Sequence, residues 1–214
     1  MRLLIVGAGD HGRVLADLAR ACGDEPIGFI QPGQADGRMV DGLPILGTLE
    51  HPAPWIVPGL GFTIGLGDNR ERAAAFERCS ALGLEAVSLV HPSVVVLGGA
   101  EIGPGAQVCA GAVIGLAARI GPDVIVNTGA TVDHDDVLGE HAFVGPGAHL
   151  AGNVTVEPGA HVGLGAIVRE GVRIGAWSYV AAGGVVIRDV PPSTRVAGVP
   201  ARPMDGGSPP HAEP

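Results

Sequence analysis

An aliphatic residue recurs at every sixth position through the second half of this 214-residue chain. From Val96 to Val186, all sixteen positions of the series are Val, Ile or Leu. The residue four places later is small almost throughout, and Asp136 is the exception. A six-residue period of this length predicts a parallel β-helix, in which three hexapeptides form one triangular coil. The aliphatic residues are expected to fill the prism and the small residues to occupy its corners.

The first 88 residues follow a different pattern, in which apolar runs typical of strands alternate with helical periodicity. Strands are predicted at 2–6, 26–30 and 62–67, a loop at 31–42, and helices after a glycine turn at 7–12 and from Asp68, as N-cap, to Gly83. This alternation predicts a small parallel sheet. We therefore expect an α/β domain at 1–88, the β-helix at 89–204 and a disordered, Pro/Gly-rich tail at 205–214.

Composition restricts the binding partners and the cellular compartment that can be expected for this chain. Hydrophobic residues make up 46% of the chain and aromatic residues only 3%, so the core must be aliphatic. The net charge of -9 argues against nucleic-acid binding, because no basic stripe offsets the acidic excess. The odd number of cysteines, Cys22, Cys79 and Cys109, favours buried thiols in a reducing compartment. The first apolar run is too short for a signal peptide or a membrane span, which predicts a cytoplasmic protein that does not enter the membrane.

His134 is the first candidate for chemistry. It lies two residues after the inward-facing Val132, so its side chain is expected outside the prism at a corner. Acidic residues flank it, Asp136 follows, and Asn127 precedes it by about one hexapeptide. A carboxylate beside an imidazole fixes its tautomer and raises its basicity, as a general base near neutral pH requires. The alternative is a solvated histidine on a polar corner.

His141, His149 and His161 follow closely and suggest a zinc site, as in β-helical carbonic anhydrases. His134 and His141 differ from one another, and from the other two, in their place within the six-residue period. This difference argues against a shared metal ion, and no metal is expected.

The turn "GAGDHG" is the second candidate, because Gly7, Gly9 and Gly12 give the spacing G-x-G-x-x-G between a strand and a helix. Backbone N–H groups at such a helix N-terminus can hold a phosphate, and a purely structural turn needs fewer glycines. A dinucleotide site expects an acidic residue after the second strand, where this chain has Gln31 and Pro32. NAD is therefore not expected.

Several segments together resemble one family: "LLIVGAGDHGRVLAD", "IGLGDNRER", "SLVHPSV", "NTGATVDHDDVLGEHAFVGPGAHLAGNVTV" and "VAGVPARPM". The chain is similar, from about residue 2 to residue 204, to bacterial nucleotide-sugar N-acetyltransferases, the family that also contains sialic acid O-acetyltransferases. This resemblance implies a Rossmann-like domain that holds a UDP- or GDP-linked amino sugar. It also implies a left-handed β-helix that forms a homotrimer and binds acetyl-CoA as co-substrate in the groove between subunits.

The resemblance also assigns roles to residues. His134 matches the catalytic base, Asp135 the acid paired with it, and Asn127 the asparagine that lines the site. Gly152 matches the glycine whose N–H faces the thioester oxygen. The acetyl-CoA site is further expected to include Phe143, Gly163, Ala182, Arg188 and Arg195. The nucleotide-sugar site is expected to include Gly9, Asp10, His11, Gly12, Gln31, Gly67, Asp68 and Asn69.

Two departures from the family pattern stand out. Phe143 replaces a second histidine near the acetyl group, although His141 is close, and Gln31 with Pro32 replaces an acidic pair. Arg188, Arg195 and Arg202 near the end of the repeat are candidate partners for the phosphates of CoA. The chain is accordingly expected to be an acetyl-CoA-dependent N-acetyltransferase that transfers directly, without an acyl-enzyme. The alternatives are an O-acetyltransferase of a sialic acid or related sugar, and a noncatalytic scaffold that binds sugar nucleotides.

Overall fold

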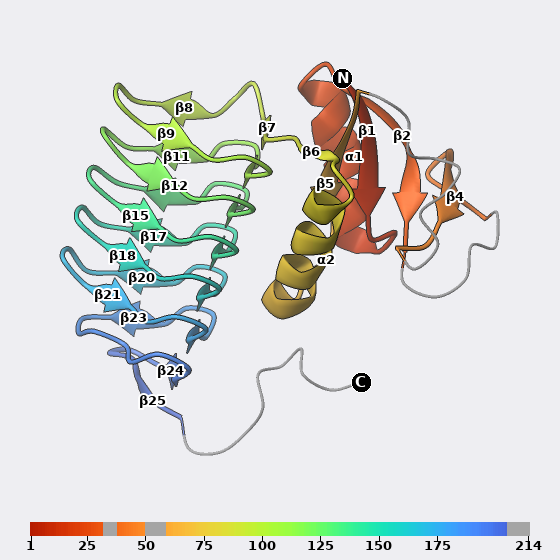
Figure 1. The fold of residues 1–214 in the computed structure, drawn as a ribbon. Coiled ribbons are helices and arrows are strands. Elements are labelled where there is room, and N and C mark those ends of the chain that lie inside the picture. Colours follow the sequence, from red (N-terminus) through yellow and green to blue (C-terminus); the bar gives the residue numbers. More distant parts are fainter. Residues whose placement is uncertain (32–37, 50–58, 205–214) are drawn as a thin grey trace. The chain divides into compact units, whose positions relative to one another are not determined.

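The computed structural model of the protein describes residues 1–31, 38–49 and 59–204. It divides into two compact units, Met1–Pro92 and Ser93–Pro214, where the sequence places the boundary after residue 88 (Figure 1). The tail predicted at 205–214 lies outside the described residues. Each unit is described by itself.

The first unit is an α/β domain built on one sheet with strand order β3-β4-β2-β1-β5-β6. Its elements are β1 Arg2–Val6, α1 Asp10–Ala21, β2 Glu25–Ile30, β3 Met39–Val40, β4 Leu43–Gly47, β5 Leu60–Ile64, α2 Asn69–Ala81 and β6 Glu85–Ala86. Strand β1 pairs in parallel with both β2 and β5, as the alternation of strands and helices predicts. Buried side chains such as Leu4, Phe62 and Ile64 form its core.

The sequence analysis correctly places the two helices but misses one hairpin. Asp68 caps α2, accepting hydrogen bonds from the N–H groups of Arg70 and Glu71, and Gly83 follows the helix with φ +76°. The predicted loop at 31–42 is wrong at its end, where β3 pairs antiparallel with β4. Asp41 and Gly42 join these strands with φ of 47° and 78°. An Asp-Gly pair with two positive φ angles is a hairpin turn signal.

The second unit is a parallel β-helix with three faces (Figure 1). One face holds β8 Val95–Val96, β11 Val113–Ile114, β14 Thr131–Val132, β17 His149–Leu150, β20 Ile167–Val168 and β23 Val185–Val186. A second holds β9 Glu101–Ile102, β12 Arg119–Ile120, β15 Val137–Leu138, β18 Thr155–Val156 and β21 Arg173–Ile174. The third holds β10 Gln107–Val108, β13 Ile125–Val126, β16 Phe143–Val144, β19 His161–Val162, β22 Tyr179–Val180, β24 Arg195–Ala197 and β25 Arg202–Pro203, and β7 Leu89–Val90 precedes β8 in the chain.

The six-residue period has its predicted structural meaning. Paired strands are one coil, or 18 residues, apart, as Val113 is from Val95. The aliphatic series is buried from Val108 to Val186, whereas Val96 is 44% exposed at the first coil. Four residues connect successive strands, and we call each such group a corner. Its fourth residue is the small one of the predicted pattern in most corners, and it is buried from Ala106 onward.

Two of the cysteines are buried, and neither helix of the described chain is long and apolar enough to span a membrane. Cys79 and Cys109 are buried, and burial raises the pKa of their thiols to about 12 and about 11. The two helices, of 12 and 13 residues, are not long and apolar enough to cross a membrane, and no other helix in the described part of the chain is.

Candidate active site

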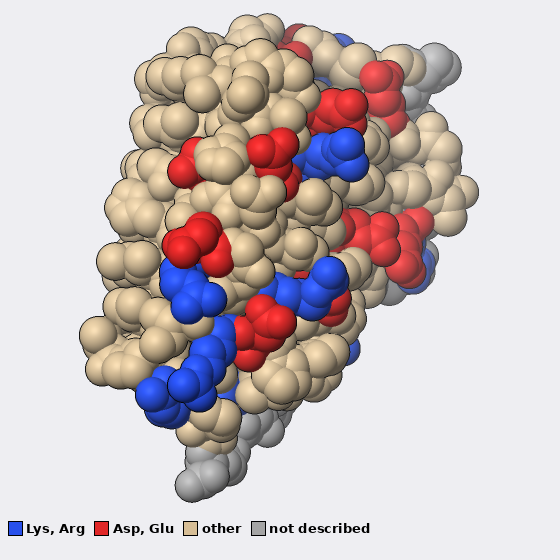
Figure 2. Space-filling model, turned by 90° about the vertical axis from the view of Figure 1, so that its left-hand side faces the viewer, with Lys and Arg blue, Asp and Glu red and all other residues tan. Residues whose placement is uncertain are grey.

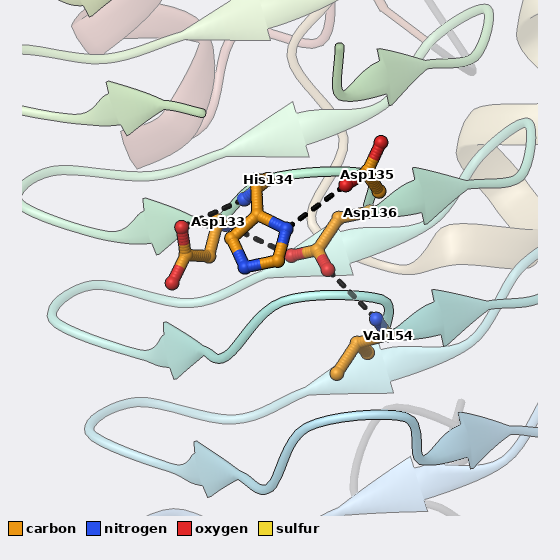
Figure 3. A network of polar contacts seen from close by, with 5 residues as sticks. All are labelled: Asp133, His134, Asp135, Asp136 and Val154. Atoms are coloured by element: carbon orange, nitrogen blue, oxygen red, sulfur yellow. Dashed lines mark hydrogen bonds and ion pairs between the residues drawn. The ribbon is translucent and has the colours of Figure 1, made fainter. Parts of the chain in front are cut away.

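The corner at residues 133–136 joins β14 to β15 and carries the predicted base (Figure 3). We call it the His134 corner. The backbone N–H of His134 donates to Asp133 Oδ1 at 2.7 Å, and its ring Nδ1 lies 2.9 Å from Asp135 Oδ2. The side chains of His134 and Asp135 are 50% and 56% exposed. The imidazole and its carboxylate therefore face solvent outside the prism.

The contact with Asp135 determines how the His134 ring can react. A carboxylate only accepts hydrogen bonds, so we assign the hydrogen of the neutral ring to Nδ1 and the lone pair to Nε2. The hydrogen bond to Asp135 raises the pKa of His134 above its ordinary value; partial desolvation opposes this, and the negative charges of Asp133 and Asp135 add to it. His134 is thus a stronger base than a free histidine, with Nε2 as its basic atom.

Gly152 lies one coil further on, in the corner 151–154, which we call the Gly152 corner. A Cβ on Gly152 would lie 2.4 Å from both Nε2 and Cε1 of His134. The φ of Gly152 lies outside the left-handed region, so its backbone does not require glycine. The imidazole of His134 therefore occupies the space that a side chain at residue 152 would fill.

The N–H of Gly152 is available for a ligand. No backbone acceptor takes it within the described residues. The second position of a corner is occupied by proline at Pro104, Pro122 and Pro146, which shows that an N–H here is not needed by the ladder of strands. The basic Nε2 and this N–H thus lie on the same edge of the prism, one coil apart.

Asp136 is the residue that breaks the small-residue rule, and its side chain is fully buried. Its Oδ2 accepts the N–H of Asp133 at 2.9 Å, and its Oδ1 accepts the N–H of Val154 at 2.7 Å (Figure 3). Burial raises the pKa of the Asp136 carboxyl to about 7, although the two N–H donors favour the ionised form. The sequence marks this residue as an exception but does not reveal these bonds.

Three other predicted site residues, the catalytic candidate Asn127 and the acetyl-CoA candidates Gly163 and Ala182, lie on a different edge of the prism. Asn127 belongs to the corner before β14, whereas the His134 corner follows β14. Its Oδ1 accepts the N–H of Thr128 at 2.7 Å. Gly163 and Ala182 belong to later corners of the same edge as Asn127, as the 18-residue strand pairing shows. The structure therefore divides the predicted site between two edges.

Phe143 lies on the outer side of the third face, where it begins a column of stacked rings. Its ring centroid is 4.4 Å from that of His161, which is 4.7 Å from Tyr179. The guanidinium of Arg195 lies 5.6 Å from the Tyr179 centroid, within the range of a cation–π contact. Phe143 and Arg195 thus belong to one column.

The arginines near the end of the repeat do not all lie together. Arg188 and Arg202 both line a pocket of about 150 Å³ that also includes Asp189, whereas Arg195 packs on Tyr179. On the face of the β-helix that Figure 2 shows, acidic and basic side chains are interspersed, and basic ones gather over the last coils.

The three other coil histidines have separate surroundings. Nδ1 of His141 contacts Asp123 Oδ2 at 2.9 Å in a buried pair, so His141 does not take the exposed place of a second site histidine. Nδ1 of His149 contacts Thr131 Oγ1 at 2.9 Å, and His161 lies in the ring column. No cluster of three or more metal-binding side chains forms among the residues described.

The glycine turn opens a pocket of about 590 Å³ in the first unit, which we call the glycine pocket. It lies at the carboxyl ends of β1, β2 and β5, where α1 begins without a side-chain cap. Its lining is Gly7, Ala8, Gly9, Asp10, His11, Gln31, Gly65, Leu66 and Gly67. The predicted Gly9, Asp10, His11, Gln31 and Gly67 therefore come together, and Pro32 lies outside the described residues.

The glycines of this pocket differ in what requires them. Gly7, Gly12 and Gly65 interlock, because a Cβ on Gly12 would lie 1.9 Å from the Gly7 carbonyl oxygen and one on Gly65 would lie 2.5 Å from Gly12 Cα. By contrast, a Cβ on Gly9 or Gly67 would meet no atom within 4 Å, and neither φ lies in the left-handed region. The fold itself therefore does not require glycine at these two positions, and both leave space in the pocket.

Two predicted residues have structural partners next to the pocket. Asp68 caps α2 through Oδ1, and Asn69 Oδ1 accepts a hydrogen bond from the buried Arg72 at 2.7 Å. Neither lines the glycine pocket. The sequence analysis overlooks Gly65 and Leu66, although "GLG" after β5 is a second glycine turn beside the first.

Known proteins resemble both units. A family model described as the PglD N-terminal domain matches residues 2–79. The acetyltransferase domain of PglB from Neisseria gonorrhoeae is 36% identical, with 95% of this chain and 99% of that chain covered and a TM-score of 0.86. PerB from Caulobacter crescentus, in complex with CoA and GDP-perosamine, is 38% identical over 95% of this chain and 97% of that chain, also with a TM-score of 0.86. WeeI from Acinetobacter baumannii is 25% identical, with 95% of this chain and 100% of that chain covered and a TM-score of 0.84. The curated proteins include no match.

The chain belongs to the nucleotide-sugar acetyltransferases of the hexapeptide-repeat family. Its predicted architecture, an α/β domain followed by a β-helix, is confirmed. Family membership makes this acetyltransferase an enzyme and rejects the noncatalytic scaffold.

Proposed function

We propose that this acetyltransferase transfers the acetyl group of acetyl-CoA to the amine of a UDP- or GDP-linked amino deoxysugar, with His134 as the general base. The observation that carries this proposal is the exposed His134–Asp135 pair, whose free Nε2 lies over Gly152. The relatives in complex with CoA, acetyl-CoA or GDP-perosamine support the two substrates.

The reaction proceeds directly between the two substrates. Nε2 of His134 accepts a proton from the sugar amine as its nitrogen attacks the thioester carbonyl carbon. The Gly152 N–H stabilises the negative charge that develops on the carbonyl oxygen. The C–S bond then breaks, and the CoA thiolate takes the proton from the His134 imidazolium. Asp135 holds Nδ1–H throughout and stabilises the imidazolium by its charge.

The glycine pocket is our proposed site for the nucleotide. The first N–H groups of α1 have no side-chain cap. Uncapped N–H groups at a helix N-terminus can bind phosphate. Gly9 and Gly67 leave room for the ligand, while His11 and Gln31 supply polar groups beside it. Gly12 has a packing role, and Asp68 and Asn69 would contribute by holding the start of α2 next to Gly67.

The phosphates of CoA would bind near the last coils. Arg188 lies on the same edge of the prism as His134 and three coils further on, which corresponds to roughly 14 Å at the spacing of neighbouring strands. An extended pantetheine arm can cover that length. Basic side chains gather over these coils (Figure 2), so an acidic protein has a local surface that attracts the phosphates.

A homotrimer would bring the two edges together. Asn127, Gly163 and Ala182 lie on one edge, and His134 and Gly152 on another. Within one prism these edges lie at opposite ends of each strand of the face that contains β14. If one subunit contributes the His134 edge and its neighbour the Asn127 edge, a single groove contains all of these residues. We place this trimer in the cytoplasm, where both substrates are made.

Product analysis tests the proposal. Purified protein is incubated with acetyl-CoA and a set of UDP- and GDP-linked amino deoxysugars, GDP-perosamine among them, and release of the CoA thiol is followed. We expect one sugar nucleotide to gain an acetyl group that survives mild alkali. Loss of that group in alkali would instead identify an O-acetyltransferase. Absence of CoA release with every sugar would contradict the proposal.

A further inference from the structure

The buried Asp136 carboxylate interrupts the regular hydrogen bonding of the coils at one place. In corners from Leu97 to Arg169 the N–H of the first residue donates to a carbonyl of the next coil, as Gly115 does to Val132 at 2.7 Å. Among these described corners Asp133 is the exception, because its N–H donates to Asp136 Oδ2.

The strand pairing changes at the same place. Neighbouring coil strands between β8 and β23 keep two paired residues each, for example Val137 with Thr155 and Leu138 with Val156. The described pairing of β14 with β17 keeps only Thr131 with His149. The ladder therefore ends one residue early, directly before the His134 corner.

The second bond of Asp136 reaches the Gly152 corner. In corners whose fourth residue is alanine, the N–H of that residue stays within its own turn, as Ala148 donates to Gly145 and Ala160 to Glu157, both at 3.1 Å. The N–H of Val154 donates instead to Asp136 Oδ1 at 2.7 Å. One carboxylate thus joins the corner that carries the base to the corner that carries the N–H beneath it (Figure 3).

We propose that Asp136 is a positioning residue for acetyl transfer, which sets where the His134 ring lies relative to the Gly152 N–H. This inference rests on the proposed function, because it needs His134 as base and Gly152 as donor. A charged residue in a buried corner otherwise costs stability, and alanine serves in the corners before and after it, at Ala130 and Ala142. One of its bonds takes the Asp133 N–H out of the ladder directly before His134, and the other holds the Val154 N–H of the Gly152 corner.

The positioning role of Asp136 depends on its ionisation state. The carboxylate form accepts at both oxygens, whereas protonation turns one of them into a hydrogen-bond donor, and burial raises the pKa of this carboxyl to about 7. Asp133 and His134 act on its charge from its own corner, and the Gly152 corner offers it the uncharged Val154 N–H. Both Asp136 and His134 must lose a proton for activity. As the pH drops, turnover should therefore fall with the slope expected when two protons are taken up.

Asp136→Ala tests the proposal, with GDP-perosamine, or whichever amino deoxysugar nucleotide the wild type acetylates, as acceptor. In this variant the Asp133 N–H can donate to the next coil, as the first residues of the other described corners from Leu97 to Arg169 do, so we expect a melting temperature near that of the wild type. Turnover should fall at least tenfold with the KM for acetyl-CoA unchanged, because the catalytic geometry moves. Ser178→Ala, at the same corner position, is the matched control and should keep full turnover. Wild-type turnover in Asp136→Ala would overturn the proposal, as would a lower melting temperature with unchanged turnover per folded molecule.

Asp136→Asn serves if the alanine variant does not fold. It keeps the shape but accepts at only one atom, so turnover should fall and the acid side of the pH profile should lose one of its two protons. An unchanged profile with full turnover would overturn the proposal. His134→Ala in the same assay distinguishes failure of the proposed function from failure of the positioning role of Asp136. If it keeps full turnover, the proposed function fails; if it is inactive while both Asp136 variants are normal, only the positioning role fails.

Discussion

Two histidines in consecutive corners of the β-helix each contact an aspartate at the same distance. His134 Nδ1 lies 2.9 Å from Asp135 Oδ2, and His141 Nδ1 lies 2.9 Å from Asp123 Oδ2. The first pair is 50% and 56% exposed, and the second is 9% and 0% exposed. The hydrogen bond alone therefore does not make a catalytic base. What differs is access to the second ring nitrogen and the residue that lies beneath it.

The positions of the two histidines in their corners account for this difference. His134 is the second residue of its corner, and its side chain points out of the prism. It lies over Gly152, where the backbone conformation does not require glycine. His141 is a third corner residue with φ of 60°, and Asp123 is the third residue of the corner one coil before it. The His141 pair links two coils, whereas the His134 pair lies within one corner. We infer that the His141 pair stabilises the coil and that the His134 pair carries the chemistry.

Removal of the exposed ring should have the largest effect. His134→Ala is expected to lower turnover at least a hundredfold, since a positioned base typically contributes about that much or more. Binding of acetyl-CoA and the melting temperature should change little, because the ring is half exposed and packs only at a corner. Steady-state kinetics and thermal denaturation check this. Turnover close to the wild type would remove the distinction between the two pairs.

Filling the space beneath the ring should have the next largest effect. In Gly152→Ala the new Cβ would overlap Nε2 and Cε1, so the ring must rotate away, and we expect a loss of turnover of roughly tenfold to a hundredfold. Stability should stay near the wild type, because the ring that moves is the end of a side chain at the surface. Gly98→Ala is the control, since its Cβ meets only Leu116 Cδ1 at 3.9 Å. Equal turnover in both variants would contradict a role for ring position.

Much of this comparison could be predicted from the sequence, but its decisive parts could not. The period fixes which residues point inward, and it correctly places His134 outside the prism. The 18-residue separation of Asp123 and His141 places them in neighbouring coils, but the period cannot reveal that this pair is buried. It also cannot distinguish Gly9, which nothing in the fold requires, from Gly12, which packing requires. Such distinctions depend on atoms from other segments.

Neutralising the partner of the exposed ring should have a smaller effect that depends on pH. The hydrogen bond to Asp135 is the main cause that raises the pKa of His134, so Asp135→Asn should lower that pKa. The base form then persists to lower pH, and the acid limb of kcat/KM should move toward lower pH. At higher pH the rate should fall about tenfold, because the ring is a weaker base without a carboxylate to stabilise its charge.

A pH profile of kcat/KM for Asp135→Asn, beside one for Glu101→Gln, checks this prediction. The control removes one negative charge from the β-helix away from the His134 corner and should leave the limb in place. A limb that stays fixed in Asp135→Asn, or moves to higher pH, would show that Asp135 does not govern the ionisation of His134.

Breaking the buried pair should have the smallest effect on the reaction and a clear effect on stability. His141→Ala leaves the buried Asp123 Oδ2 without the ring that it contacts, which should cost about 1–3 kcal/mol of unfolding free energy. Turnover per folded molecule should stay at the wild-type level, because His141 neither faces solvent nor lies on the His134 edge. Denaturant unfolding and active-site-normalised kinetics on the same samples separate the two quantities. A drop in turnover at full stability would place His141 in the site after all, and the similarity of the two pairs would then be one of function.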